Sequence, residues 1–474
     1  MITATASTLA GDLHAQASHP GYDRLLRSDV SGYVHVPIGL CEDYPEESTT
    51  LEIIRNDLEL LRRSGIDLLR ISFGWDGIEG SKDQYDWLFW DDFVKMAVEE
   101  YGITLIPYIA YTPLWNSTNE DPNDSWHFPP KDYDEFGEFM FDLVSRYKPW
   151  IKSWELWNEP DIWIFWAGDQ DEFARLLKIG SEAVRRADPE AVVVLGGLAH
   201  DTDWLESLFR EKEISGYVDV VNMHNYYETW VGRPMEDIVG YINRVDAIVR
   251  EHGHGQTLWM AEVGYSTYRD GARVSDDYSA YYDYEHTRPY QAVDIVRRLT
   301  AALSTGKLSA ITWYEIKDLN PGELTIGDFE NNGNLGVASA SYEPKPGQHA
   351  LAFFSRLTSE PMRPIDPEIT VSRSENSDAH VHVFEQEDGD VIVVGWLQTF
   401  VPEKRGDPGL GDHKDQRSET VSVTLPRAVS GDASRFDETG GESPFNMIVR
   451  QETETSLRLE LSGGGVTIVH VKNQ

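Results

Sequence analysis

The chain has 474 residues, of which 40% are apolar and 11% aromatic, and its 81 acidic against 41 basic residues give a formal net charge of −40. This composition is that of a globular protein long enough for one large domain and a smaller one, and the acid excess argues against nucleic acid or an anionic membrane as a partner. No apolar run approaches the roughly 20 residues that span a bilayer.

Residues 1–30 are expected to form an N-terminal segment, which could add a strand to the C-terminal part of the chain. They lack a basic region followed by an apolar one, as a secretory signal would have, so we expect a soluble, cytoplasmic protein. The single cysteine, Cys41, cannot form an internal disulfide.

Acidic residues are spread along the whole chain, and lysine is scarcer than arginine. This balance resembles that of proteins from salt-accumulating halophiles, in which molar salt screens the repulsion between like charges. We therefore expect a halophilic protein in a high-salt cell interior, and an ordinary acidic mesophilic protein is the alternative.

Apolar runs rich in β-branched residues alternate with helical stretches between residues 31 and 357. The expected strands cover residues 33–39, 66–75, 103–111, 151–160, 191–199, 218–227, 257–267 and 308–316. Amphipathic segments predict helices over residues 51–65, 91–102, 171–189, 235–253 and 346–357. Eight strand and helix units in one run predict an α/β fold, a (β/α)8 TIM barrel, over residues 31–357.

From about residue 358 the pattern of apolar residues changes from a helical period to a period of two. Period-two segments at 380–386, 390–400, 419–425, 456–462 and 466–471 are separated by turn signals. Residues 358–474 are therefore predicted to form an antiparallel β-sandwich. His380 and His382 have a spacing seen in metal ligands, but no partner cluster accompanies them, so we predict neither a metal site nor a cofactor.

Two glutamates stand at the carboxyl ends of expected barrel strands, where the active sites of such barrels lie. Glu159 closes the fourth strand and Glu262 the seventh, and both follow apolar runs in which a carboxylate needs a partner or a function. Two carboxyl groups facing each other across a barrel mouth can divide the work of glycoside hydrolysis between a proton donor and a nucleophile or base. Their aromatic surroundings suit the stacking of sugar rings.

An ordered set of motifs resembles the retaining glycoside hydrolases of clan A. The motifs are WNEP at 157–160, MHNYY at 223–227, AEVGYS at 261–266 and Trp313. The resemblance spans the second to the eighth expected strand, about residues 67–315. The WNEPD loop and the appended sandwich are most similar to glycoside hydrolase family 39. Family 5 is the next resemblance, although the histidine typical of that family near the third strand is not evident in residues 106–115.

The resemblance implies a double displacement with retention, in which Glu262 is the nucleophile and Glu159 the acid/base. It also implies a set of supporting residues: Asn158 on the sugar 2-hydroxyl, Tyr226 on the nucleophile, His224 beside the acid/base, Arg70 orienting Glu262 and keeping it ionised, and Trp313 as the floor of the subsite. The alternatives are a plain salt bridge for Arg70, a core histidine for His224 and an ordinary strand-end tyrosine for Tyr226.

Further aromatic and acidic residues follow the strands. Trp115 and Trp163 are candidates for sugar subsites, and Glu315 is a candidate for binding hydroxyls. Trp75 and Trp166 could also line sugar subsites or pack in the core, and Glu79 is a second candidate for binding hydroxyls.

The substrate expected from the resemblance is a β-glycoside, cut by a β-xylosidase-like or related exo-glycosidase. Family 39 members act on β-xylosides and on uronic acid glycosides, and the scarcity of lysine and arginine at the strand ends favours a neutral sugar. Alternatives are an endo-acting clan A glycanase, a transglycosylase, a non-catalytic carbohydrate-binding protein and a metal-dependent barrel enzyme. A homo-oligomer is left open.

Overall fold

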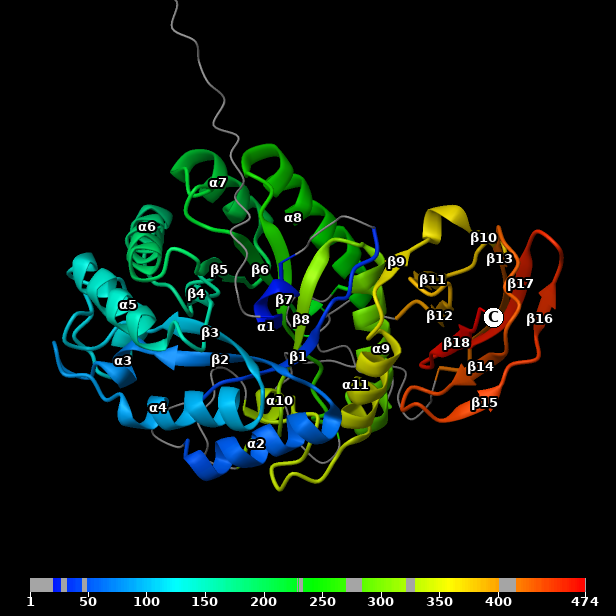
Figure 1. Cartoon of the computed structure of the whole chain (residues 1–474), viewed down its shortest axis with the longest axis horizontal. Helices are drawn as coiled ribbons and strands as arrows, with labels where there is room; N and C mark the ends of the chain where they lie inside the picture. The colour runs from blue at the N-terminus through cyan, green and yellow to red at the C-terminus, as the bar shows by residue number, and fades with distance from the viewer. Residues whose placement is uncertain are drawn as a thin grey trace, which may run out of the picture.

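A closed parallel barrel is joined to a pair of antiparallel sheets. The computed structural model describes residues 20–26, 32–44, 49–227, 229, 233–269, 284–320, 329–399 and 415–473. Eight strands close the barrel in the order β1-β2-β3-β4-β5-β6-β7-β8, each parallel to its neighbours. Figure 1 shows the barrel and its helices on one side and the strands that follow β9 on the other. The predicted TIM barrel with an appended antiparallel sandwich is confirmed.

The barrel strands are short and almost wholly buried. They are β1 (Ile38–Glu42), β2 (Leu68–Gly74), β3 (Thr104–Ala110), β4 (Ser153–Asn158), β5 (Val192–Leu198), β6 (Val220–Asn225), β7 (Thr257–Val263) and β8 (Leu308–Tyr314). Seven of them lie inside the ranges predicted for them. The first begins later than predicted, because Pro37 lacks an N–H for the ladder and Val34 pairs instead with Met362.

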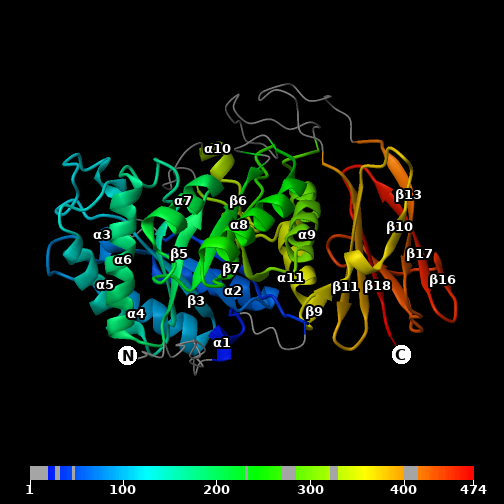
Figure 2. The ribbon, with the colours of Figure 1, turned by 90° about the horizontal axis from the view of Figure 1, so that it is seen from above.

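Helices surround the barrel and fill the connections between its strands. They are α1 (Pro20–Asp23), α2 (Leu51–Ser64), α3 (Trp75–Ile78), α4 (Leu88–Lys95), the π-helix η1 (Met96–Glu100), α5 (Tyr133–Tyr147), α6 (Gln170–Ala187), α7 (Thr202–Lys212), α8 (Ile238–His252), α9 (Arg288–Ser304), α10 (Phe329–Asn332) and α11 (Pro346–Leu357), with 3-10 turns at η2 (Ser125–His127) and η4 (Met235–Asp237). Figure 2 shows this layer from above. None of the helices in the described residues has the length and apolar character needed to cross a membrane.

Local signals in the sequence fix several helix ends. Thr50 caps α2 by accepting a hydrogen bond from the Ile53 N–H, and Gly65 ends that helix in the left-handed region at φ 69°. Asp169 and Glu172 form a reciprocal capping box at the start of α6. These caps set both ends of α2 and the start of α6.

Residues 20–26 close the barrel at the end where its strands begin. Tyr22 and Leu25 are buried against residues that fill the barrel interior, including Leu68, Ile106 and Trp259. The Tyr22 hydroxyl donates to the Leu105 carbonyl at 2.6 Å, and the Trp259 indole donates to the Leu25 carbonyl at 2.8 Å. Residues 20–26 thus form a helix and a turn, and not a strand of the sandwich. Residues 1–19 and 27–31 lie outside the described part of the chain, where that strand stays a prediction.

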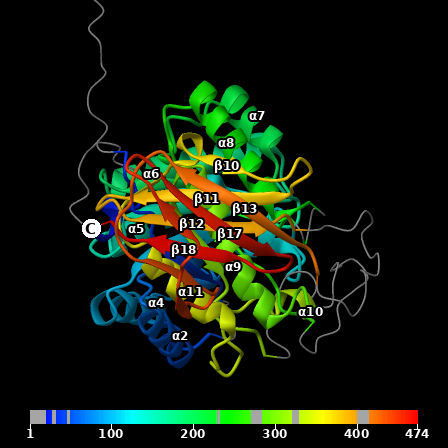
Figure 3. The ribbon, with the colours of Figure 1, turned by 90° about the vertical axis from the view of Figure 1, so that its right-hand side faces the viewer.

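The C-terminal strands form two facing sheets. One has the order β10-β13-β17-β16 and the other β15-β14-β18-β12-β11-β9. Their bounds are β9 (Met362–Pro364), β10 (Thr370–Ser372), β11 (Ala379–Gln386), β12 (Val391–Leu397), β13 (Ser418–Leu425), β14 (Ala433–Phe436), β15 (Glu442–Pro444), β16 (Ile448–Arg450), β17 (Thr455–Ser462) and β18 (Thr467–Val471), with a 3-10 turn η5 (Asp366–Glu368). Alternate apolar residues of both sheets form a separate core between them, and Figure 3 shows the sheets in front of the barrel.

The sandwich packs on the barrel through α9 and the loop that follows β6. Helix α9 contacts β11 and β12, and the Arg297 guanidinium donates to the Gly465 carbonyl at 2.7 Å. Glu236, in η4, accepts the Trp396 indole N–H at 2.8 Å and the Thr399 N–H at 3.0 Å. Helix α11 ends at Leu357 and β9 begins at Met362, and the domain boundary placed between residues 357 and 358 stays a prediction.

Candidate active site

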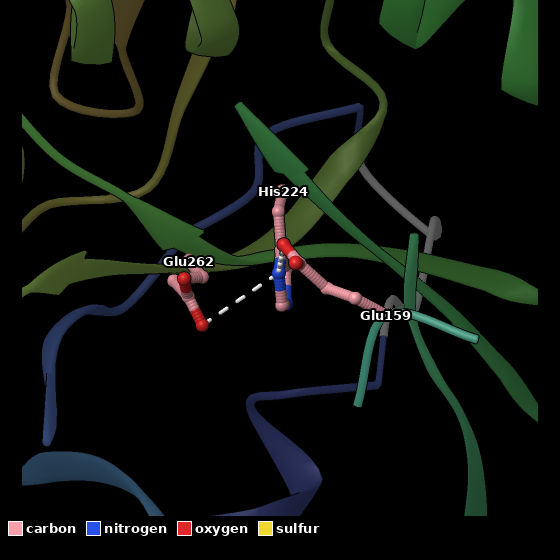
Figure 4. A group of neighbouring side chains, drawn as sticks. All are labelled: Glu159, His224 and Glu262. Atoms are coloured by element: carbon pink, nitrogen blue, oxygen red, sulfur yellow. Dashed lines mark hydrogen bonds and ion pairs between the residues drawn. The ribbon is translucent and has the colours of Figure 1, made fainter. Parts of the chain in front are cut away.

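Glu159 and Glu262 converge at the carboxyl-terminal end of the barrel. Glu159 follows the last residue of β4, and Glu262 is the penultimate residue of β7. Ligand atoms of the two carboxylates and of His224 on β6 lie within 4.8 Å of one another. Figure 4 shows His224 between the two glutamates, with all three side chains pointing toward a common centre. The site predicted from two distant strand ends is therefore one place in the fold.

Glu159 is held by the chain on one side and by His224 on the other. Its backbone has φ 43° and its N–H donates to the Gly197 carbonyl at 2.9 Å. His224 Nδ1 lies 2.8 Å from Glu159 Oε1 and 3.6 Å from Glu262 Oε2. A side chain at Gly197 would collide with the imidazole, since a Cβ there would lie 2.0 Å from His224 Nε2. The glycine therefore leaves the room that the histidine occupies.

Burial and charge separate the proton affinities of the two glutamates. Burial, followed by the negative charge of Glu262, raises the pKa of Glu159 well above its usual value. Burial also raises the pKa of Glu262, to about 7, but the Arg70 charge and the Tyr226 hydrogen bond oppose that rise. The Arg70 charge also lowers the pKa of Glu159, but of the two glutamates only Glu262 accepts hydrogen bonds from Arg70 and Tyr226, so Glu262 loses its proton before Glu159 does.

His224 is neutral in this environment, because burial and then the Arg70 charge lower the pKa of its imidazole well below 6.5. A neutral imidazole can donate from Nδ1 to an ionised carboxylate or accept there from a protonated one. His224 can therefore stay bonded to Glu159 in either protonation state of the acid.

Arg70 is the fully buried cation of the site. Its Nη1 donates to Glu262 Oε2 at 2.9 Å, and its Nε and Nη2 donate to the two oxygens of Glu155 at 2.8 and 2.9 Å. Nη2 also donates to Asn158 Oδ1 at 2.8 Å. The guanidinium thus ties the nucleophile candidate on β7 to two residues of β4. Its carbon lies 4.4 Å from the centre of the Tyr108 ring, a distance typical of a cation–π contact.

Glu155 is a part of this network that the sequence reasoning missed. Besides Arg70, its Oε1 accepts the Gly197 N–H at 2.9 Å and the Asn222 side-chain amide at 3.0 Å. A signal was present, because an acid inside the buried run SWELWN requires a compensating cation. Arg70, on β2, is that cation.

Tyr226 approaches Glu262 from the side of the carboxylate opposite to Arg70. Its hydroxyl donates to Glu262 Oε1 at 2.9 Å. Burial, with the Glu262 charge second, raises the pKa of this phenol well above 10. Tyr226 therefore remains a donor over the whole neutral range, and each oxygen of Glu262 has one fixed donor.

Two of the predicted site residues, Trp313 on β8 and Glu315 just after it, are fully buried. Trp313 lies beside Val263 of β7 and is fully buried, and its indole N–H has no hydrogen-bond partner among the described residues. Glu315, which follows β8, is also fully buried, and within the described chain neither carboxyl oxygen has a partner. Burial and the nearby Glu42 raise the pKa of Glu315 well above its usual value. The structure does not open this carboxyl to the mouth.

The tryptophans of the loops divide into exposed and packed groups. Trp163, after β4, is 73% exposed, and Trp115, after β3, is half-buried with its N–H on the Glu79 carbonyl at 2.8 Å. Trp75 and Trp166 are buried among other aromatic rings. The Glu79 carboxylate accepts the Trp75 N–H at 2.8 Å and supports the loop.

Within the part of the chain that the structure describes, two groups of side chains are close enough to hold a metal ion. One is the set of Glu159, His224 and Glu262, and the other, on the surface, is the set of Asp83, Glu135 and Glu138. In the first group, the Arg70 guanidinium already donates a hydrogen bond to Glu262 Oε2, and its positive charge would repel a metal ion there. The second has no feature beyond clustered acids, one of which pairs with Lys82.

The chain is similar to known glycoside hydrolases in sequence and in fold. The sequence pattern of the glycosyl hydrolases family 39 matches residues 55–400. A "Beta-xylosidase" of Caldicellulosiruptor saccharolyticus is 26% identical over 247 residues, which are 49% of this chain and 48% of that protein. The chain thus spans about half the length of this curated relative.

Solved structures share the fold at low identity. A family 39 glycoside hydrolase from the gut symbiont Bacteroides cellulosilyticus WH2 has a TM-score of 0.66 at 16% identity, over 92% of this chain and 81% of that one. A monomeric beta-xylosidase from Caulobacter crescentus CB15 has a TM-score of 0.61 at 18% identity, over 94% and 97%. Because the family pattern covers more than half of the sequence, the chain belongs to family 39 of the glycosyl hydrolases.

Proposed function

We propose that this chain hydrolyses β-glycosidic bonds by double displacement, with Glu262 as the nucleophile and Glu159 as the general acid and base. The observation that carries the proposal is the unequal support of two carboxyl groups in one site. Glu262 has a guanidinium and a phenol, both donors, on its two oxygens, whereas Glu159 faces a neutral imidazole. Hydrogen-bond donors stabilise the ionised form of Glu262, whereas the neutral imidazole can accept a hydrogen bond from Glu159 and so allows Glu159 to stay protonated.

The first step forms a covalent glycosyl-enzyme. A Glu262 carboxylate oxygen attacks the anomeric carbon while Glu159 gives its proton to the departing glycosidic oxygen, so the bond to the leaving group breaks as the ester to Glu262 forms. The second step reverses these roles. Glu159, now ionised, takes a proton from water, the water oxygen attacks the anomeric carbon, and the Glu262 ester bond breaks.

The closeness of the two carboxylates supports retention of configuration. Retaining enzymes hold their carboxyl groups about 5 to 5.5 Å apart, whereas inverting enzymes leave room for a water at about 6.5 to 9.5 Å. Here oxygens of Glu159 and Glu262 lie within 4.8 Å of each other. This closeness fits the retaining arrangement better than the inverting one.

The family and the charge of the site both support a neutral sugar as the substrate. The curated relative is a beta-xylosidase, and the donors of Arg70, the described cation at the centre of the site, are already bonded to Glu155, Asn158 and Glu262. A uronate would need a free cation, so a neutral glycone such as a β-xyloside fits better. Asn158 would bind the 2-hydroxyl, and Trp115 and the exposed Trp163 would contact the leaving group on the β4 side.

The test is a pair of variants assayed with azide. Glu262→Ala should lose turnover, and added azide should give the glycosyl azide of inverted configuration, because the small anion enters the space of the missing carboxylate. Glu159→Ala should retain activity on substrates with very good leaving groups, and azide should give the product of retained configuration. Near-native rates in both variants, or an inverted sugar from the native protein in a proton spectrum, would refute the proposal.

A further inference from the structure

Asp43 is an exposed carboxylate set among buried residues at the barrel mouth. It directly follows β1, and its neighbours Glu42 and Tyr44 are buried. Tyr108 of β3 donates to Asp43 Oδ1 at 2.5 Å, and the hydroxyl of Tyr314 of β8 donates to Asp43 Oδ2 at 3.1 Å. Two phenols from different strands therefore fix the orientation of this carboxylate while leaving it open to a ligand.

Asp43 belongs to the same site as the two glutamates. Strand β1 pairs with β2 at Arg70 and with β8 at Trp313, and the charge of Asp43 contributes, after burial, to raising the pKa of both Glu159 and Glu262. In the strand order β1 lies next to β8 and three strands away from β4. Glu159, at the end of β4, marks the side of the leaving group. Asp43 thus faces the part of the site where the reacting sugar would lie.

The hydrogen-bonding capacity of Asp43 is half used. An ionised carboxylate can accept about four hydrogen bonds, two at each oxygen, and the tyrosines supply one to each. No ion pair within the described chain involves Asp43. A fixed carboxylate with one free acceptor position on each oxygen matches two hydroxyl groups on adjacent carbons.

We propose that Asp43 is a specificity-determining residue that accepts hydrogen bonds from the 3- and 4-hydroxyls of a neutral glycone and excludes a glycone that carries a carboxylate. The proposal rests on the proposed function, in which Asn158 takes the 2-hydroxyl and leaves the 3- and 4-hydroxyls as the adjacent pair. A uronate would place a second negative charge near Asp43 with no described cation free to balance it.

The experiment compares Asp43→Asn with the native protein on nitrophenyl β-xyloside, β-glucoside and β-glucuronide. Loss of charge-assisted hydrogen bonds should lower kcat/KM on the two neutral substrates by about ten- to a hundredfold. The ratio of glucuronide to glucoside activity should rise at least about tenfold, because the repulsion is gone. Asp92→Asn removes the same charge from an exposed position on α4 and should leave every rate within about twofold.

Deoxy substrates locate the contact. With the native protein, the 3-deoxy and 4-deoxy glucosides should each react about tenfold or more slowly than the parent, and Asp43→Ala should erase most of that difference. If the Asp43 variants do not fold, Tyr314→Phe serves, because it loosens the carboxylate and should lower the neutral rates severalfold with an unchanged glucuronide ratio.

The outcomes separate the two proposals. Deoxy penalties equal in the native and Asp43→Ala proteins, or an unchanged glucuronide ratio in Asp43→Asn, would overturn the role of Asp43 while leaving the hydrolase intact. A native protein inactive on every glycoside would overturn both proposals.

Discussion

Removal of the Tyr226 hydroxyl should change the pH range in which the enzyme works. Tyr226 donates to Glu262 Oε1 at 2.9 Å, and this bond favours the ionised carboxylate. Tyr226→Phe deletes one donor and leaves the ring and the Arg70 contact in place. The proton should therefore bind more tightly to Glu262, and the nucleophile should become available only at higher pH.

The size of the effect follows from the bond that is lost. A hydrogen bond to a charged group contributes about 1.5 to 3 kcal/mol, and about 1.36 kcal/mol corresponds to one pKa unit. The acidic limb of the kcat/KM profile, which reports the deprotonation of Glu262 in the free enzyme, should move upward by about one to two pH units. The basic limb, which reports the loss of the proton from Glu159, should move much less. The pH range of high kcat/KM should therefore become narrower, with the change on its acidic side.

The assay is the pH dependence of kcat/KM on a nitrophenyl glycoside, read from about pH 4 to 9 at constant ionic strength. Tyr147→Phe is the matched control, because its hydroxyl also donates to a carboxylate, Asp91 at 3.1 Å, but on the outer helical layer. Its profile should coincide with that of the native protein. An acidic limb of Tyr226→Phe that stays in place or moves to lower pH would refute the roles assigned to Tyr226 and Glu262.

Three further predictions concern stability. Burial raises the pKa of Glu315 above its unfolded value, so the native state keeps a proton that the unfolded state loses, and the free energy of unfolding falls as the pH rises above about 4.3. Glu315→Gln should therefore have the Tm of the native protein at pH 4 and a higher Tm at pH 8. Equal Tm values of the two proteins at both pH values would count against a raised pKa of Glu315. Leu25→Ala should lower the free energy of unfolding by about 2 to 3 kcal/mol, because Leu25 is buried against residues of the barrel interior. Urea unfolding measures this change, and Leu88→Ala at an exposed position is the control. If the net charge of −40 reflects adaptation to salt, the Tm should rise by several degrees between low and molar KCl, and equal melts would remove that interpretation.

The sequence predicted the barrel well because its signals are local. Seven predicted strands contain the observed ones, since each is a short apolar run bounded by turn residues or helix signals. The first was misplaced because residues 33–36 alternate like a strand, yet Val34 pairs with Met362. That pairing depends on a residue more than three hundred positions away, and no local pattern encodes it.

Side-chain geometry in the site was predictable only where a motif specified it. The contacts of Glu262 with Arg70 and Tyr226 lie where the family resemblance placed them, whereas Glu155 and Asp43 were missed. Their partners come from other strands, so their importance appears only when the barrel closes. Glu315 follows β8 and is fully buried without a partner among the described residues, and its role in binding hydroxyls stays a prediction.

Arg70 explains how the spacing of the two carboxyl groups is set in so acidic a protein. Its rigid guanidinium fork binds Glu155 and Asn158 on β4 and Glu262 on β7 at the same time. Arg70 therefore links the carboxylate of Glu262 to β4, the strand that ends next to Glu159, while Tyr226 holds the other oxygen of Glu262 and His224 holds Glu159. A lysine would supply the charge without the fork, so it could neutralise Glu262 but could not hold it at a defined distance from Glu159.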